Sequence, residues 1–443
     1  MDRREVFQLG VAGTLGASLA AMPLAAQERE ARATSGLPAP IIKDIKVIAT
    51  QPLHARLVVV KIITDQPGLY GYGCATFTQR ADLVVPAVEK YLKPLLVGMP
   101  ADRIEDTWQA CYNSSYWRNG PVLNNAISGV DQALWDIKGR QANMPVYQLL
   151  GGKTREAALT YATVGATDAS GAVDRVHQKM EQGFKVIKIM VGVPGMSSYG
   201  PRGGTPMKGL HSGPVFESRP YMRLTQKVLE ACRNQLGEEV GLIHDVHERV
   251  SPHEAVQFAK ELEPVRLFYL EDPLSPAHLD YFRQIRQQCA TSISMGELFN
   301  SPHEWQPLIE GRLIEYIRCH VTQTGGLTPA RKIAILAENF GVKTAWHGPP
   351  DVSPVGHTAQ LHLDLASSNF GIQEGGIITG LEAEIFKGCA AYKDGYLYAS
   401  DKPGWGIEVD EELAARHPFH DDRRHLNGGW GIIRSYDGTV ISQ

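Results

Sequence analysis

Three short apolar runs each end in a carboxylate: Leu-Ile-His-Asp at residues 242–245, Phe-Tyr-Leu-Glu at 268–271 and Ile-Ser-Met-Gly-Glu at 293–297. The carboxylates Asp245, Glu271 and Glu297 are spaced by 26 residues each (271 − 245 and 297 − 271). A strand, a helix and two loops take up roughly that length in a β/α barrel. Equal spacing therefore predicts three acids at the carboxyl ends of three successive parallel strands.

Convergent carboxylates repel one another unless a cation lies between them. Mg²⁺ suits such a site, because it takes oxygen ligands and keeps some waters. The alternative is that each acid is a separate helix cap or surface charge. Three acids in one register favour a shared metal site of Asp245, Glu271 and Glu297, on the face where barrels build active sites.

Strand and helix patterns alternate on both sides of these runs. Seven β/α units and a final strand predict a modified TIM barrel, (β/α)7β, over residues 156–380. The expected strands cover residues 157–162, 186–190, 241–245, 267–270, 292–295, 316–320 and 343–346, with the last near 370–373. The Gly- and Pro-rich interval 192–219 is too long for an ordinary connection and indicates a binding loop or lid.

A different pattern precedes the barrel. Three strand-like runs and then helical periods predict an N-terminal α+β capping domain over residues 41–155. On its last helix, 126–142, Asp131 and Asp136 are expected to be solvent or interface charges. The C-terminal segment, residues 381–443, is expected to complete the capping domain by packing on it.

The first 26 residues resemble a twin-arginine export signal, with Arg3-Arg4, a mild apolar run and small residues around 23–26. Residues 27–40 are expected to be a linker. This predicts a periplasmic protein. If the segment is only an N-terminal extension, the location is cytoplasmic.

Composition bounds the partners. With a net charge of −4 and no long basic run, the sequence offers no positively charged surface for nucleic acid, so no nucleic-acid partner is expected. The apolar run near the N-terminus is too short for a spanning helix, so no membrane partner is expected. The six cysteines form no Cys-x-x-Cys pair, so neither a zinc ribbon nor a redox motif is indicated. We expect a small-molecule substrate and a homo-oligomer.

Several further residues are candidates for chemistry. His247 follows Asp245 by two positions, so strand alternation puts it on the same face as an acid or base; otherwise it is a core or capping histidine. Lys188 and Met190 share a face of the second strand, where a second lysine would be needed for a Lys-x-Lys base pair. Tyr199, in the long loop, needs a nearby cation to act as a base.

Three more residues follow the last expected strands: Arg318, His347 and Glu374. Arg318 suits a bidentate grip on a carboxylate. His347 suits a donor to a hydroxyl or to a carboxylate oxygen. Each alone is weak, but together they surround one site.

From about Ile41 onward, the chain resembles the mannonate dehydratase family of acid-sugar dehydratases, within the enolase superfamily. The matching segments are 116–121, 133–138, 143–152, 192–199, Asp245-x-His247, Glu271-Asp272-Pro273, 296–299, Arg318 with Gly325-Gly326, 347–351 and 371–374.

The resemblance implies a hydro-lyase in which Mg²⁺ on the three acids binds the carboxylate of an aldonate, such as mannonate or gluconate. It implies that Tyr199, aided by a cation, removes the C2 proton. His247 then protonates the departing 3-hydroxyl, and a 2-keto-3-deoxy acid results. We assign catalysis to Tyr199, His247, Lys188, Arg318 and His347, and substrate binding to Thr78, Thr163, Asp351, Glu374 and Trp405.

The substrate shell departs from the family pattern. Lys188 replaces an arginine, Thr78 an asparagine and Thr163 a histidine, and Pro349 stands where efficient mannonate dehydratases have alanine. Two alternatives follow: a catalytically weak or inert sugar-acid-binding regulatory homologue, or an acid-sugar racemase or epimerase. Met190 disfavours the racemase, which needs two bases.

Overall fold

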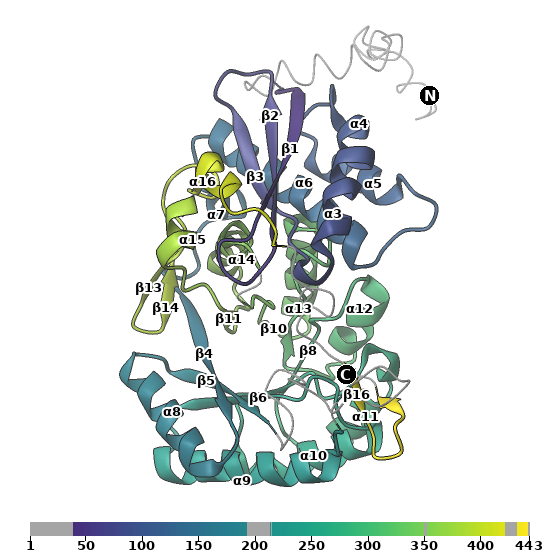
Figure 1. Cartoon of the computed structure of the whole chain (residues 1–443), viewed down its shortest axis with the longest axis vertical. Coiled ribbons are helices and arrows are strands. Elements are labelled where there is room, and N and C mark those ends of the chain that lie inside the picture. Colours follow the sequence, from purple (N-terminus) through teal and green to yellow (C-terminus); the bar gives the residue numbers. More distant parts are fainter. Residues whose placement is uncertain (1–38, 193–212, 214, 350–351, 421–431, 442–443) are drawn as a thin grey trace, which may run out of the picture.

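The computed structural model describes residues 39–192, 213, 215–349, 352–420 and 432–441. The N-terminal part forms a three-stranded antiparallel sheet of β1 (Ile42–Thr50), β2 (Leu57–Thr64) and β3 (Tyr70–Cys74). Helices α3 (Ala81–Ala87), α5 (Ile104–Asn113) and α6 (Pro121–Gln141) follow, and all lie above the barrel in Figure 1. Among the described residues, no helix combines the length and apolar character needed to cross a membrane.

Helix α6 lies directly on the sheet because β3 presents glycines to it. A Cβ atom on Gly71 or Gly73 would come within 2.2 Å of Ala133 O or 2.0 Å of Gly129 O. Only glycine permits such a close approach of backbones. The helix is therefore held between the sheet and the barrel.

This placement corrects the expectation for Asp131 and Asp136, which are both buried. Asp136 accepts hydrogen bonds from Tyr72 N at 2.9 Å and from Trp405 N at 2.8 Å. Asp131 accepts from Thr328 N at 3.0 Å, at the start of α13 (Leu327–Asn339). Helical periodicity assumes one solvated face, and α6 has protein on both sides.

Asp131 acts as a cap that the capping domain supplies to a barrel helix, since it satisfies an N–H in the first turn of α13. We expect Asp131→Ala to lower the free energy of unfolding by about 1–2 kcal/mol. Urea denaturation measures this, with Asp174→Ala on the exposed side of α8 (Ala169–Glu181) as the control. Equal losses in the two variants would contradict the capping role.

The barrel contains eight parallel strands, as predicted: β4 (Ala158–Ala166), β5 (Val186–Val191), β6 (Gly241–Asp245), β7 (Tyr269–Glu271), β8 (Ile293–Met295), β9 (Tyr316–Ile317), β10 (Lys343–Thr344) and β11 (Gln373–Glu374). Between them lie α8, α9 (Ser218–Leu236), α10 (Pro252–Glu261), α11 (Tyr281–Gln288), α12 (Pro302–Glu310), α13 and α14 (Pro354–Ala366). The barrel closes because β11 pairs with β4 and Phe370 pairs with Thr344. This is a (β/α)7β barrel.

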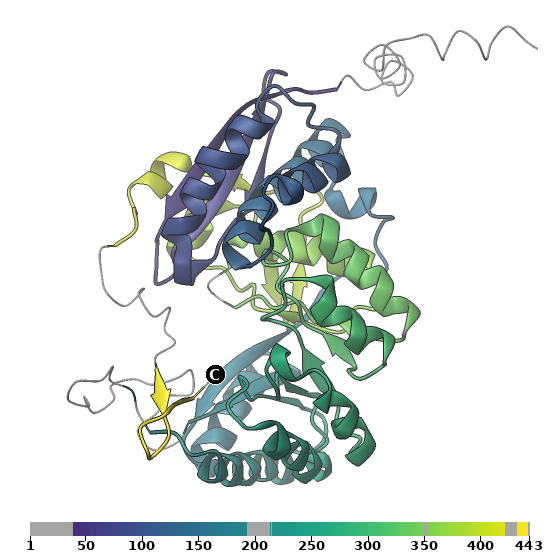
Figure 2. The ribbon, with the colours of Figure 1, turned by 90° about the vertical axis from the view of Figure 1, so that its right-hand side faces the viewer.

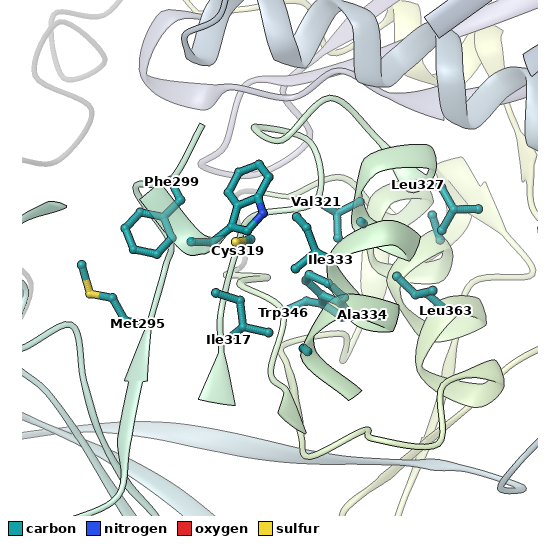
Figure 3. Close-up of a cluster of buried hydrophobic side chains, with 14 of the residues drawn as sticks. Met295, Phe299, Ile317, Cys319, Val321, Leu327, Ile333, Ala334, Trp346 and Leu363 are labelled. Carbon is teal, nitrogen blue, oxygen red and sulfur yellow. The ribbon is translucent and has the colours of Figure 1, made fainter. Parts of the chain in front are cut away.

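Alternation along the strands separates an apolar layer from a charged one. Six strands place an apolar or aromatic side chain inside and a charged or polar residue two positions later: Val186 and Lys188, Ile243 and Asp245, Tyr269 and Glu271, Tyr316 and Arg318, Ala345 and His347, and Ile372 and Glu374. The residues between them face the helices. Figure 3 shows Ile317, Cys319 and Trp346 in such an outer cluster with Ile333, Ala334 and Leu363.

The C-terminal segment packs on two parts of the molecule. Helix α16 (Glu411–Ala415) lies on β1, and Thr50 Oγ1 donates to Ala414 O at 2.9 Å. The hairpin of β16 (Ile433–Arg434) and β17 (Val440–Ile441) instead contacts the segment before α9, where Phe216 N donates to Arg434 O at 2.9 Å. Figure 2 shows both yellow elements, one beside the sheet and one beside the barrel.

Candidate active site

Charged side chains from the strand ends form one cluster at the carboxyl face of the barrel, in which Glu297 and His347 are partly exposed and the others are buried. Its members are Lys188 at β5, Asp245 at β6, Glu271 at β7, Glu297 after β8, Arg318 after β9, His347 after β10 and Glu374 at β11. Asp245 and Glu271 end adjacent strands and pair in register, whereas Glu297 lies two residues after the end of β8, so the three spaced acids reach the same face of the barrel.

Lys188 is buried among carboxylates. Its Nζ atom lies 3.3 Å from Asp245 Oδ2, 3.0 Å from Glu271 Oε1 and 2.9 Å from Glu374 Oε1. Burial alone would lower the pKa of this ammonium, but the charges of Glu271 and Glu374 hold it well above its usual value. The surrounding carboxylates therefore favour the charged form of Lys188.

Arg318 is the second buried cation, and it shares the carboxylates of Glu271 and Glu374 with Lys188. Its Nη2 atom lies 3.0 Å from Glu271 Oε1 and also binds Glu374, while Nη1 lies 3.2 Å from Glu297 Oε2. Nη2 further donates to the phenol oxygen of Tyr161 at 3.1 Å. The guanidinium thus links three carboxylates that belong to three different strands.

His247 contacts Asp245, but not because the two residues alternate along one strand. Strand β6 ends at Asp245, and His247 has a left-handed backbone with φ of 50°. Its Nε2 atom nevertheless lies 2.9 Å from Asp245 Oδ2. Burial lowers the pKa of His247, although the charge of Asp245 opposes this.

His347 lies on the other side of the cluster, with Nε2 3.3 Å from Glu297 Oε2 and 3.8 Å from Glu374 Oε2. Its ring lies 5.0 Å from that of His320, centroid to centroid. Sequence reasoning missed both His320 and Tyr161. Each could have been found from alternation, because they stand two residues from Arg318 and from Thr163 respectively.

The other predicted site residues have different outcomes. Thr163 on β4 is half-buried and pairs in register with Lys188, so it borders the cluster. Tyr199 and Asp351 lie outside the described residues. The backbone of Thr78 begins a 3₁₀ turn, but its side chain is not among those that the structure describes.

Trp405 lies against α6 and β3, and its assignment to substrate binding stays a prediction. Its side chain is fully buried, and Nε1 donates to Tyr72 O at 3.0 Å and Gln132 O at 3.2 Å. The indole therefore fixes the C-terminal segment to α6 and β3.

The acids of the cluster fit a divalent cation. Possible ligand atoms of Asp245, His247 and Glu297 lie within 4.8 Å of one another, and so do those of Glu271, Asp272 and Glu297. The two groups share Glu297. Glu271 Oε2 and Asp272 Oδ2 are buried and have no hydrogen-bond partner in the part of the chain that the structure describes.

Charge points the same way. When ionised, Asp245, Glu271, Glu297 and Glu374 carry four negative charges, against two positive charges on Lys188 and Arg318. Burial, with too little compensating charge, raises the pKa of Glu271 and of Glu297 well above the glutamate value. The acids of the cluster therefore outnumber its two cations, which favours a bound cation, and oxygen ligands favour a hard divalent one.

Two family descriptions match the sequence and divide it as the fold does. "Mandelate racemase / muconate lactonizing enzyme, N-terminal domain" matches residues 36–151, and "Enolase C-terminal domain-like" matches residues 171–413. With the capped (β/α)7β barrel and acids at its strand ends, these matches place the chain in the enolase superfamily, as the motifs indicated.

Within that superfamily, the chain belongs to the D-galactonate dehydratase family, a group of hydro-lyases related to the mannonate dehydratases. A family member from Enterococcus gallinarum is 47% identical over 404 residues, which cover 90% of this chain and 98% of the relative. One from Musicola paradisiaca is 46% identical over 422 residues, with the same coverage.

A solved structure is similar over the same length. The crystal structure of an enolase from Pantoea ananatis with bound D-gluconate and Mg superposes with a TM-score of 0.84 at 44% identity. The match covers 90% of this chain and 99% of that one. These comparisons confirm the predicted class of acid-sugar dehydratases.

Proposed function

We propose that this protein is a Mg²⁺-dependent dehydratase of an aldonate such as gluconate or mannonate, which yields a 2-keto-3-deoxy acid. The observation that carries the proposal is the cluster of Asp245, Glu271 and Glu297 at adjacent strand ends, with an excess of negative charge. The D-gluconate and Mg of the Pantoea ananatis structure support the same ligand classes.

In this proposal Asp245, Glu271 and Glu297 hold Mg²⁺. The bound ion supplies positive charge for the substrate carboxylate and for the negative charge that grows there as the C2 proton leaves. Lys188 and Arg318, held by the surrounding acids, keep Glu374 ionised and oppose the burial that raises the pKa of Glu271. The surrounding acids favour the protonated form of Lys188, so we assign the role of base to Tyr199.

His247 is assigned the transfer of a proton to the departing 3-hydroxyl. Its Nε2 atom lies 2.9 Å from Asp245 Oδ2, so the imidazole borders the proposed cation site, and this supports the assignment. Burial lowers the pKa of His247, so its protonated form is a stronger acid toward the hydroxyl, and solvent returns the proton to His247 after water leaves.

The substrate is tested by incubating the protein with a panel of acid sugars and Mg²⁺ and measuring 2-keto-3-deoxy product. The panel contains D-gluconate, D-mannonate and D-galactonate, and Asp245→Asn is the inactive control. Product from at least one aldonate supports the proposal. Solvent deuterium at C2 without dehydration would point to an epimerase, and ligand-induced stabilisation without product to a binding protein.

Binding of Mg²⁺ is expected to tighten as the pH rises. In the metal-free protein the raised pKa of Glu271 and of Glu297 keeps protons on these groups at pH values where ordinary glutamate is ionised. The ion must displace those protons, so its apparent dissociation constant falls with increasing pH. Calorimetry at several pH values, in buffers of different ionisation enthalpy, measures the release. Binding without pH dependence or proton release would contradict this.

We further propose that the protein is exported to the periplasm, with residues 1–26 as the signal. The family match begins only at residue 36, which leaves room for such a segment. N-terminal sequencing of the mature protein from cells tests this, since an intact Met1 in the cytoplasm would contradict it. The homo-oligomer stays a prediction, which the molar mass in solution tests.

A further inference from the structure

Asp272, directly after Glu271, connects the ends of the three strands near which the predicted metal ligands lie. Its backbone N–H donates to Ser294 O of β8 at 3.0 Å, and its carbonyl oxygen accepts from Glu248 N, in the loop after Asp245, at 3.0 Å. Its side-chain Oδ1 accepts from Gly296 N, next to Glu297, at 3.0 Å. One residue therefore joins the ends of β6, β7 and β8.

The backbone of Asp272 is in an unfavourable conformation. Its φ is 38°, in the left-handed region that residues with a Cβ rarely adopt. It also precedes Pro273, and a residue before proline prefers an extended backbone. Such a conformation persists only when the surroundings impose it, and it occurs most often at functional sites.

The side chain of Asp272 faces the cluster. The residue is 1% exposed, and its possible ligand atom lies within 4.8 Å of those of Glu271 and Glu297. Gly296, whose N–H donates to Asp272 Oδ1, approaches Arg318 so closely that a Cβ would lie 3.1 Å from Arg318 C. The turn before Glu297 is therefore fixed by Asp272 on one side and by the Arg318 backbone on the other.

We propose that Asp272 is a positioning residue of the cation site. Its Oδ1 atom holds the Gly296 N–H and thereby fixes the direction in which Glu297 presents its carboxylate to Asp245 and Glu271. This inference rests on the proposed Mg²⁺ site. It makes Asp272 act through Glu297 rather than as a ligand.

Calorimetric titration of metal-free protein with Mg²⁺ tests this role. Asp272→Gly deletes the side chain and relieves the left-handed backbone, so any loss reports the side chain alone. We expect the dissociation constant for Mg²⁺ to rise by about tenfold or more, as for other groups that orient metal ligands. Asp272→Asn keeps an acceptor oxygen for the Gly296 N–H and is expected to restore most of the affinity.

Controls separate the possible failures. Asp364→Asn, at another buried aspartate on α14, is expected to leave Mg²⁺ affinity unchanged. Thermal unfolding of each variant without metal shows whether it is folded. Asp272→Ala serves as a second deletion of the side chain if the glycine variant does not fold. Wild-type affinity in a folded deletion variant would overturn the proposal. So would an asparagine variant as weak as the deletion, because the carboxylate would then be a ligand. Wild-type protein that binds no Mg²⁺ would overturn the proposed function as well.

Discussion

Glu297→Gln is expected to abolish Mg²⁺ binding and to lower kcat/KM for the aldonate substrate on the order of 10³-fold, since a bound metal contributes several kcal/mol of charge stabilisation. Glu297 belongs to both groups of possible ligand atoms, one with Asp245 and His247 and one with Glu271 and Asp272. No other residue in the described part of the chain belongs to both groups, so the substitution removes one ligand from each of them.

Calorimetry and turnover assays measure the two effects together. Glutamine keeps the size of the side chain and can still accept a hydrogen bond from Arg318, so the fold is expected to be retained. Glu310→Gln, at the exposed end of α12, is the matched control and should bind Mg²⁺ normally. A Glu297→Gln variant that keeps Mg²⁺ affinity while losing turnover would place the cation elsewhere and refute the ligand assignment.

His247→Asn is expected to lower kcat for dehydration by about 10²–10⁴-fold, the usual contribution of a general acid. The variant should still exchange the C2 proton with solvent, because removal of that proton is assigned to Tyr199 and not to His247. Proton NMR in deuterium oxide measures exchange and product formation in one sample. Exchange without dehydration is the expected signature.

The structure supplies the controls for this variant. His253→Asn replaces an exposed histidine of α10 and should keep wild-type rates. Mg²⁺ affinity of His247→Asn should change little, since the proposed ligands are the three carboxylates. Loss of exchange together with dehydration would assign His247 to the base instead. Loss of Mg²⁺ binding would make it a ligand, as its 2.9 Å distance from Asp245 permits.

The barrel and its acid cluster could be predicted because strand alternation is strictly local. An apolar residue two positions before Lys188, Asp245 or Glu271 is enough to place each charge above a packed layer. The same rule correctly put His247 beside Asp245, but alternation is not the cause. Strand β6 ends at Asp245, and the left-handed backbone of His247 directs its side chain back to Asp245.

Other features depend on contacts between distant parts of the chain. Asp131, Asp136 and Trp405 are buried because α6 is covered by the sheet, by α13 and by the C-terminal segment at once. Periodicity along one helix contains no information about those partners. Alternation from Thr163 puts Tyr161 on the inner face of β4, but its hydrogen bond to Arg318, 157 residues further along the chain, could not be predicted.

A crystal of the protein soaked with Mn²⁺ and D-gluconate tests the central claim most directly, because Mn²⁺ takes the same oxygen ligands as Mg²⁺ and scatters anomalously. The account predicts one anomalous peak, ligated by Asp245, Glu271 and Glu297, with the sugar carboxylate completing its coordination. A peak outside these three acids would contradict it, and so would a peak ligated by His247 without Glu271.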